Sequence, residues 1–422
     1  MKKLLHLPIQ KAQDMVRFVR ELPRAVALVF LLYFLQGVVH NLGHPVTPAL
    51  VEGMGIDDYY FGLYFAAMSL GLFVGAPIWG VLGDRGNKRT YIVLGLIVYS
   101  IGQYAFAFVG DRNVMILFRF LSGFGVSASI TLIMSHLIEH SSDSKRTVYL
   151  GFYQALFVLG GSVGYYLGGR MTEIPWLIDV FRTDDYRNVF FIQAVVNVFH
   201  AALAFVIIGR DTVRNPAASK NPLQGFADIK KLDKNLIVFL ISLALISLGA
   251  INITKFIEVF MNESGYSPTD IGTFVGATGI VSIVATIVIV PVVAAAKRDF
   301  TFMVVIQALS AVIIFLVFRS NELLVTLYTG FMVYVVLKAV YTPLEQHYIS
   351  SHAKPGEYGK IMGVRQSFFS IGLVVGPLIG GFLYEARPLL VFDFSVLMFV
   401  IGFVLLLLIG RNIRRTGNGA HS

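Results

Sequence analysis

Residues 151–169 of this chain read GFYQALFVLGGSVGYYLGG, and residues 363–381 read GVRQSFFSIGLVVGPLIGG. In each stretch the second glycine follows the first after eight intervening residues, and two more glycines follow at intervals of four. Glycines four apart lie on one face of a helix and let two helix backbones approach closely. Because both copies share this irregular spacing, they indicate an internal duplication. The predicted helix-packing positions are Gly151, Gly160, Gly164 and Gly168 in the first copy, and Gly363, Gly372, Gly376, Pro377 and Gly380 in the second.

The composition around these stretches is typical of a membrane protein. Of 422 residues, 56% are hydrophobic and 14% are charged, whereas a soluble chain carries roughly 25% charged residues. Apolar segments of about 18–26 residues can cross a hydrocarbon core of about 30 Å, and they must be helical there because each backbone donor needs a partner within its own segment. We therefore expect an all-α membrane protein with 12 transmembrane helices in two pseudo-symmetric six-helix bundles. The predicted spans are 25–47, 61–82, 91–109, 115–138, 148–170, 188–209, 235–259, 269–293, 301–318, 323–348, 361–384 and 390–410.

The longest polar interruption divides these spans six and six. It predicts a tail at 1–24, a six-helix bundle at 25–209, a central loop at 210–234, a second bundle at 235–410 and a tail at 411–422. The two bundles repeat more than the glycine pattern. Gly55 and Gly62 recur 210 residues later as Gly265 and Gly272, and Lys88–Arg89 recurs 209 residues later as Lys297–Arg298.

The basic residues predict the orientation of the chain. Assigned to alternate sides of the twelve spans, the lysines and arginines outside the spans divide twenty-four against six. The positive-inside rule therefore places both termini and the central loop in the cytoplasm, at the plasma (inner) membrane. The net charge of +9 is explained by this topology, so we expect no nucleic-acid partner.

Two further motifs resemble a known family. Residues 80–89 read GVLGDRGNKR, and residues 119–125 read RFLSGFG. Together with the glycine stretch at 151–169, they resemble the signature loop, the helix-4 arginine motif and the antiporter motif of the major facilitator superfamily, closest to its twelve-helix drug/proton antiporters. Asn87 stands at a glycine position of the loop, which it suits because asparagine tolerates left-handed turns. Tyr165 replaces the proline of the antiporter motif, which the second copy keeps as Pro377.

The resemblance implies transport by alternating access, with a substrate cavity between the two bundles. It assigns a conformational latch to the signature loop and the end of helix 4; serving the membrane topology alone is the alternative for these charges. The latch residues are Gly80, Asp84, Arg85, Lys88, Arg89 and Glu139.

Charges inside the spans need a reason, because an ionisable group at membrane depth costs about 2.5–3.5 kcal/mol or more. We expect proton or charge coupling at Arg119, Glu258 and Glu345. Snorkelling is the alternative for Arg119, and an exposed pair with Lys255 is the alternative for Glu258. Arg365 is expected to partner Glu345 or a lipid phosphate.

The substrate cavity is predicted from polar residues on helices 1 and 10. Tyr334, Lys338, Tyr341 and Glu345 follow at spacings of four, three and four, so they share one helix face. On helix 1, His40 and Asn41 begin a broken polar segment that continues through His44, Pro45 and Pro48. The alternative for His40 is a histidine that is hydrogen-bonded within the bundle and has no role in transport. The predicted cavity residues are His40, Asn41, Tyr334, Lys338 and Tyr341. The alternative for Lys338 is a structural contact, with Glu345 or with a neighbouring helix.

These observations predict a function by resemblance. The sequence contains no cysteine, phosphate loop, metal-ligand spacing or nucleophile with a placed base, so we expect no enzyme, no cofactor and no metal. We expect proton-coupled efflux of a small hydrophobic or cationic compound by a monomer that contacts membrane lipids, with a proton or other ion gradient as the energy source. Two alternatives remain open: uptake of a polar or anionic solute or flipping of a lipid-linked headgroup, and a non-transporting receptor or scaffold.

Overall fold

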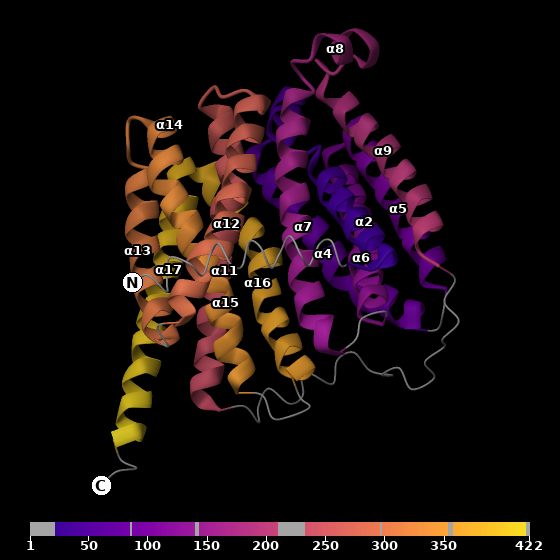
Figure 1. Cartoon of the computed structure of the whole chain (residues 1–422). Helices are drawn as coiled ribbons and strands as arrows, with labels where there is room; N and C mark the ends of the chain where they lie inside the picture. Colours follow the sequence, from indigo (N-terminus) through magenta and orange to yellow (C-terminus); the bar gives the residue numbers. More distant parts are fainter. Residues whose placement is uncertain are drawn as a thin grey trace. The chain divides into compact units, whose positions relative to one another are not determined.

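The computed structural model describes residues 22–84, 87–139, 143–209, 233–295, 298–352 and 358–418 (Figure 1). In this part of the chain every regular element is a helix. Eleven of the described helices are long and apolar enough to cross a membrane. The remaining predicted span, 148–170, corresponds to α7 (Asp143–Arg170), whose glycines and tyrosines lower its hydropathy. The all-α membrane architecture predicted from the sequence is confirmed.

The chain divides into two compact units, which are described separately. Unit 1 contains Met1–Lys220 and Met261–Ile283, and unit 2 contains Asn221–Phe260 and Val284–Ser422. The predicted domain boundaries stay a prediction. Gly55 and Gly265, the paired glycines of the repeat, both have a positive φ, 64° and 85°, so the two copies share this turn conformation as well as their sequence.

Unit 1 is a bundle in which α4 and α5 pack on α6, α5 packs on α9, and α2 packs on α7. The short helix α8 lies beyond the connected ends of α7 and α9 (Figure 1). The helices are α2 (Arg24–Asn41), α3 (Thr47–Gly53), α4 (Asp58–Asp84), α5 (Lys88–Phe108), α6 (Arg112–Glu139), α7, α8 (Pro175–Phe181) and α9 (Tyr186–Ile207).

The first predicted span is broken as the sequence suggested. Helix α2 ends at Asn41, residues 42–46 form turns, and α3 begins at Thr47. Pro45 and Pro48 explain the break, because proline lacks the N–H that an α-helix needs in its interior. His40 and Asn41 therefore lie in the last turn of α2, and His44 lies on the turn that follows it.

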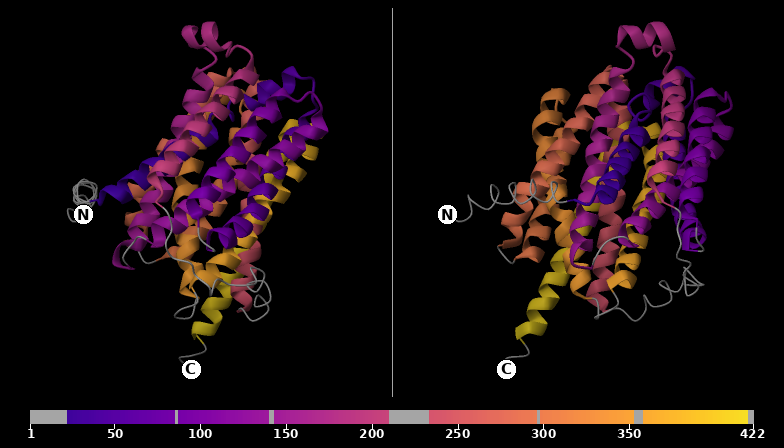
Figure 2. Two further views of the ribbon diagram at one scale, coloured as in Figure 1. Left: turned by 90° about the vertical axis from the view of Figure 1, so that its right-hand side faces the viewer. Right: turned by 45° about the vertical axis from the view of Figure 1, so that its right-hand side comes forward.

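Unit 2 contains α11 up to Phe260, the second half of α12, and the remaining helices. In this unit α13 packs on α17 and α15, and α16 packs on α17 and α15. The C-terminal part of α17 extends beyond its unit-2 neighbours (Figure 2). The helices are α11 (Lys234–Glu263), α12 (Pro268–Ala295), α13 (Asp299–Val317), α14 (Leu323–Thr326), the π-helix η2 (Leu327–Phe331), α15 (Met332–Ser351), α16 (Tyr358–Ala386) and α17 (Pro388–Asn418).

Large apolar side chains are exposed along the helices of both units. Phe199 is 70% exposed and Val206 is 79% exposed on α9, and Leu316 is 60% exposed on α13. Monomeric soluble proteins rarely expose contiguous apolar surface of this kind. These side chains are placed to contact lipid, which agrees with a multi-pass membrane protein.

Candidate functional site

The glycines of α7 bring its backbone against that of α2. A Cβ added to Gly160, Gly164 or Gly168 would lie 2.1, 2.3 and 1.9 Å from the carbonyl oxygens of Phe34, Val38 and Leu42, respectively. Real Cβ atoms do not approach oxygen this closely, so only glycine fits at these three positions. The seam between α2 and α7 is thus a direct backbone contact.

The equivalent seam of unit 2, between α11 and α16, is less uniform. A Cβ on Gly372 would lie 2.3 Å from the side-chain oxygen of Ser247 and 2.7 Å from its backbone carbon, whereas a Cβ on Gly376 would lie 3.3 Å from the Leu248 oxygen. At Gly380 the nearest atoms are side-chain atoms, Phe256 Cε2 at 2.4 Å and Asn252 Oδ1 at 2.6 Å. The two backbones therefore touch at Gly372, separate toward Gly380, and are bridged there by side chains.

Two glycines of the pattern stand apart from these seams. Among the described residues, a Cβ on Gly151 would meet nothing within 4 Å, so the structure gives this glycine no packing contact. The surroundings of Gly363 lie outside the described residues. Pro377 lies inside α16, in the part of the seam where the backbones have separated.

The signature loop is described in part. Asn87 has φ 74° and stands directly before α5, so the expected left-handed asparagine is confirmed. Lys88 is 2% exposed, and the Arg89 guanidinium lies 4.0 Å from the centroid of the Phe205 ring. A Cβ on Gly80 would make an ordinary contact with Thr131, at 3.8 Å.

The remaining partners of the predicted latch cannot be placed in the same way. The side chains of Asp84 and Glu139 and the whole of Arg85 lie outside the described residues. The conformational latch therefore stays a prediction.

Arg119 is buried inside unit 1 and does not snorkel. It is 3% exposed, its guanidinium lies 3.6 Å from the centroid of the Phe106 ring, and it donates to Gln103 Oε1 at 3.1 Å and to Thr47 Oγ1 at 3.4 Å. Hydrogen bonds and a ring face make a buried guanidinium tolerable. The cation is thus built into the bundle beside the break in helix 1.

A chain of amides and hydroxyls continues from this arginine. Gln103 Nε2 donates to the Tyr99 hydroxyl at 2.8 Å, and Gln193 Nε2 donates to the same hydroxyl at 3.0 Å. The Tyr99 hydroxyl donates to the His40 carbonyl oxygen at 3.3 Å, and the His40 ring stacks on the Tyr99 ring at 5.7 Å. Asn41 donates to the Gly37 carbonyl oxygen of its own helix at 2.8 Å.

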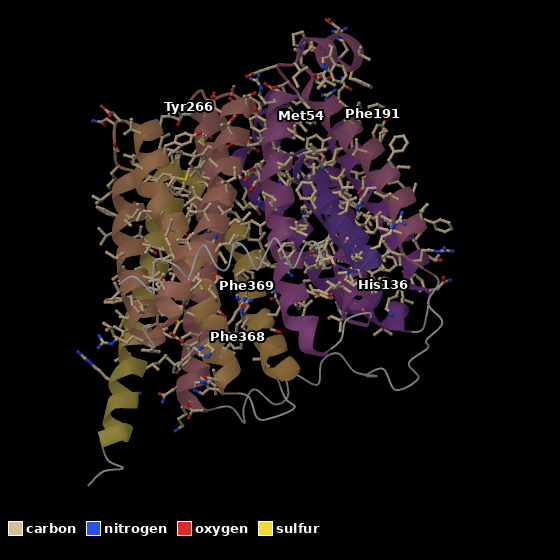
Figure 3. The ribbon with its side chains drawn as sticks, in the orientation of Figure 1. Met54, His136, Phe191, Tyr266, Phe368 and Phe369 are labelled. Carbon is tan, nitrogen blue, oxygen red and sulfur yellow. The ribbon has the colours of Figure 1, made fainter. Side chains whose placement is uncertain are left out.

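Unit 2 contains a buried ion pair. Arg365 of α16 donates from Nε and Nη2 to the two carboxylate oxygens of Glu345 on α15, both at 2.8 Å. The Arg365 side chain is 9% exposed and that of Glu345 is 2% exposed. The Arg365 guanidinium also lies over the ring of Phe369, which is labelled in Figure 3, at 4.9 Å from the ring centroid. Of the two partners expected for Arg365, the structure shows Glu345.

Lys338 and its two tyrosines line one cavity. The cavity has a volume of about 30 Å³ and is lined by residues of α11, α13, α15 and α17. Lys338 is exposed, and it donates to Thr254 Oγ1 of α11 at 3.4 Å. The residues that line the cavity are Ile246, Ala250, Ile306, Gln307, Ser310, Tyr334, Lys338, Tyr341 and Phe399.

The other predicted coupling residue, Glu258, is fully buried on α11. Lys255, one turn earlier on that helix, lies close enough to Lys338 for the two positive charges to interact. In the described part of the chain, no group of three or more histidines and carboxylates could hold a metal ion.

Sequence reasoning missed several polar residues of these two sites. Gln103 links Arg119 to Tyr99, and Gln307 and Ser310 line the cavity beside Lys338. Gln307 and Ser310 are both 3% exposed. Their signal was available, because each is a polar residue within a mainly apolar helix. Their neighbours, however, lie on helices distant in sequence.

A comparison with protein families supports the architecture. A sequence profile of the Major Facilitator Superfamily matches residues 29–298 and 237–420. The chain is 23% identical over 372 residues to the quinolone resistance protein NorA of Staphylococcus aureus (strain COL), covering 85% of this chain and 90% of that one. It is 24% identical over 364 residues to multidrug resistance protein 1 of Bacillus subtilis (strain 168), covering 86% and 90%.

Solved structures share the fold. The nucleoside transporter NupG superposes with a TM-score of 0.72 at 14% identity, over 93% of this chain and 99% of NupG. A bacterial homologue of the human lysosomal transporter Spinster superposes with a TM-score of 0.73 at 14% identity, over 92% and 96%.

Proposed function

Since the chain belongs to the Major Facilitator Superfamily, we propose that it exports a small hydrophobic compound across the plasma membrane in exchange for protons. It is a transporter and not an enzyme. In this proposal the protein works as a monomer, with both termini in the cytoplasm, and exports the compound by alternating access. The proton gradient supplies the energy, and no bound cofactor is needed. The names of NorA and of the Bacillus relative, which refer to drug resistance, support efflux.

The observation that carries proton coupling is the bidentate pair between Glu345 and Arg365. Both side chains are buried, and both lie near the ends of apolar segments, 323–349 and 364–386. Removing one partner of such a pair costs about 3–5 kcal/mol, because a buried charge is left uncompensated. If α15 and α16 separate during the transport cycle, the negative charge of Glu345 must be neutralised by something other than Arg365.

Proton binding provides that neutral state. A protonated Glu345 no longer needs Arg365, so uptake of a proton and separation of the two helices favour each other. Reformation of the pair expels the proton. Because a coupling free energy is reciprocal, a proton gradient can drive this opening and closing in one direction.

The test is transport by purified protein in lipid vesicles. Three dansyl probes with the same fluorophore are offered under an imposed pH gradient: dansylglycine (an acid), its methyl ester (neutral) and dansylcadaverine (a cation). We expect the wild type to accumulate at least one probe and to lose the accumulation when a protonophore collapses the gradient. Glu345→Gln should abolish gradient-driven accumulation while retaining exchange of labelled for unlabelled probe.

Asp393→Asn provides the matched control. Asp393 pairs with Arg319 in the same unit, but the two side chains are 29% and 37% exposed, so this variant should transport as the wild type does. Gradient-driven accumulation by Glu345→Gln at the wild-type level would refute the coupling role of Glu345. Wild-type accumulation that is insensitive to the protonophore would refute proton coupling altogether.

A further inference from the structure

We propose that the cavity around Lys338 is an anion subsite that binds the carboxylate of an amphiphilic organic acid. The inference rests on the proposed function and narrows its substrate class from small hydrophobic compounds to those with an acidic group. It is carried by the donors that face the cavity, by the local charge and by the size of the cavity.

The cavity is lined by hydroxyl donors that nothing in the described part of the chain satisfies. Tyr334 and Tyr341 are 3% and 5% exposed, both line the cavity, and neither hydroxyl has a hydrogen-bond partner among the described residues. A buried polar group without a partner costs about 1–3 kcal/mol. Two such hydroxyls beside one cavity indicate a ligand that accepts hydrogen bonds.

With the ammonium group of Lys338, the cavity has more unsatisfied hydrogen-bond donors than unsatisfied acceptors. It has three N–H donors, and the described residues give it one contact, the 3.4 Å hydrogen bond to Thr254. The unsatisfied acceptor at the cavity is Gln307 Oε1, which one of these donors can serve. A carboxylate, which only accepts hydrogen bonds, matches the donors that remain.

The charge around the cavity is positive. Lys255 adds a second cation whose charge interacts with that of Lys338. Glu258 balances at most one of the two lysines, and Glu345 is held through both its oxygens by Arg365. The ion pair of Lys338 with Glu345, considered from the sequence, is therefore not formed, whereas the contact with a neighbouring helix is present as the bond to Thr254 of α11. Because Lys338 has no ion pair among the described residues, its positive charge is left for a ligand.

The size and walls of the cavity limit which part of a ligand it can hold. Its volume of about 30 Å³ is far below the roughly 300–1,000 Å³ of a site for a drug-sized ligand, so it admits a small group such as a carboxylate and not a whole drug-sized molecule. Ile246, Ile306 and Phe399 contribute apolar walls. An acid whose apolar body lies outside and whose carboxylate enters the cavity matches both features.

The experiment measures equilibrium binding to the full-length protein in detergent, without any gradient. The fluorescence of dansylglycine, of its methyl ester and of dansylcadaverine reports the dissociation constant of each. We expect the acid to bind most tightly. Lys338→Gln should raise its dissociation constant about tenfold to hundredfold, since a hydrogen bond to a charged group is lost. The affinity for the ester should not change.

Two milder variants keep the test valid if Lys338→Gln fails to fold. Tyr334→Phe and Tyr341→Phe remove only the unsatisfied hydroxyls and should each weaken binding of the acid about two- to tenfold. Tyr348→Phe is the matched control: its hydroxyl is also buried without a hydrogen-bond partner among the described residues, on the same helix, but Tyr348 does not line the cavity. This control should bind the acid as the wild type does.

The outcomes separate this inference from the proposed function. No binding of dansylglycine, or equal binding of the acid and the ester, would overturn the subsite. Equal affinity of the tyrosine variants and the wild type for the acid would also overturn it, and would leave the cavity as a water site. Acid-selective binding without proton-driven transport would support the subsite while refuting the proposed function.

Discussion

Helices α7 and α16 have the same glycine pattern, yet they contact their neighbours by different means. In unit 1, α7 meets α2 backbone to backbone at Gly160, Gly164 and Gly168. In unit 2, α16 touches the α11 backbone at Gly372, and side chains fill the space beyond. An ion pair then joins α16 to α15.

The two kinds of seam differ in how far their contacts can rearrange. A seam of bare backbone offers no rotamer to adjust, so it holds α7 in one position on α2. A seam bridged by side chains can reorganise through rotamer changes and through protonation of Glu345. We therefore expect α16 to be the helix whose contacts respond to protons, and the four predictions below test this contrast.

The largest effect is expected at the ion pair. Arg365→Gln leaves Glu345 buried without its partner and should lower the free energy of unfolding by about 3–5 kcal/mol, measured by titrating the protein from mild detergent into SDS. The double variant with Glu345→Gln should recover most of this loss. Arg319→Gln, at the half-exposed pair with Asp393, should cost at most about 1 kcal/mol. Equal costs for the two arginines would show that α16 is not held by the pair.

The next effect compares one glycine from each seam at equivalent positions. Gly164→Ala places a Cβ 2.3 Å from the Val38 oxygen and should lower the free energy of unfolding by about 1–3 kcal/mol through overpacking. Gly376→Ala places a Cβ 3.3 Å from the Leu248 oxygen, a contact that a small shift of the two helices can accommodate. This variant should change the free energy of unfolding by less than about 0.5 kcal/mol. The same unfolding titration measures both, and a reversed order would refute the contrast between the seams.

A double-mutant cycle sharpens the role of side chains in the second seam. Gly380→Ala collides with the side chains of Asn252 and Phe256, so Asn252→Ala should rescue part of its cost, with a coupling of about 1 kcal/mol. In the first seam, a Cβ on Gly168 meets the Leu42 carbonyl oxygen, and Asn41→Ala should therefore give no rescue. Additive behaviour in both cycles would contradict the side-chain bridge.

The smallest effect concerns a single hydrogen bond across the second seam. Ser247 Oγ donates to the Phe369 carbonyl oxygen of α16 at 3.3 Å, besides a 2.9 Å bond to Ala244 within its own helix. Ser247→Ala should cost about 0.5 kcal/mol more than Ser395→Ala, because the Ser395 hydroxyl bonds, among the described residues, only to the Val391 carbonyl oxygen of its own helix, at 2.7 Å. Melting curves followed by tryptophan fluorescence compare the two, and indistinguishable values would show that the crossing bond contributes nothing.

Much of the fold was predictable because the signals are local. Hydrophobic runs of membrane-spanning length gave the helices, and the prolines at 45 and 48 gave the break after Asn41. Asn87 was identified as a left-handed position from its place in a turn motif. These features depend on a residue and its neighbours in sequence, which periodicity and backbone sterics govern directly.

The site was predictable only in part. The spacing of Tyr334, Lys338 and Tyr341 placed them on one helix face, and they do line one cavity. Spacing could not show that Gln307 of α13 completes that cavity or that Arg119 binds Gln103 of α5. Neither could it distinguish the backbone seam of α7 from the side-chain seam of α16, because the glycine pattern is the same in both.

A duplicated bundle of membrane helices with buried charges follows from the amino-acid sequence alone, because hydrophobic length, glycine spacing and the distribution of lysine and arginine are properties of the linear chain. The pairing of these charges became visible only in the folded structure. Arg365 takes both oxygens of Glu345, so this carboxylate does not pair with Lys338 on the same helix face. The physical reason is that an ion pair depends on distances of about 3 Å between helices, and those distances are set by packing and not by position in the chain.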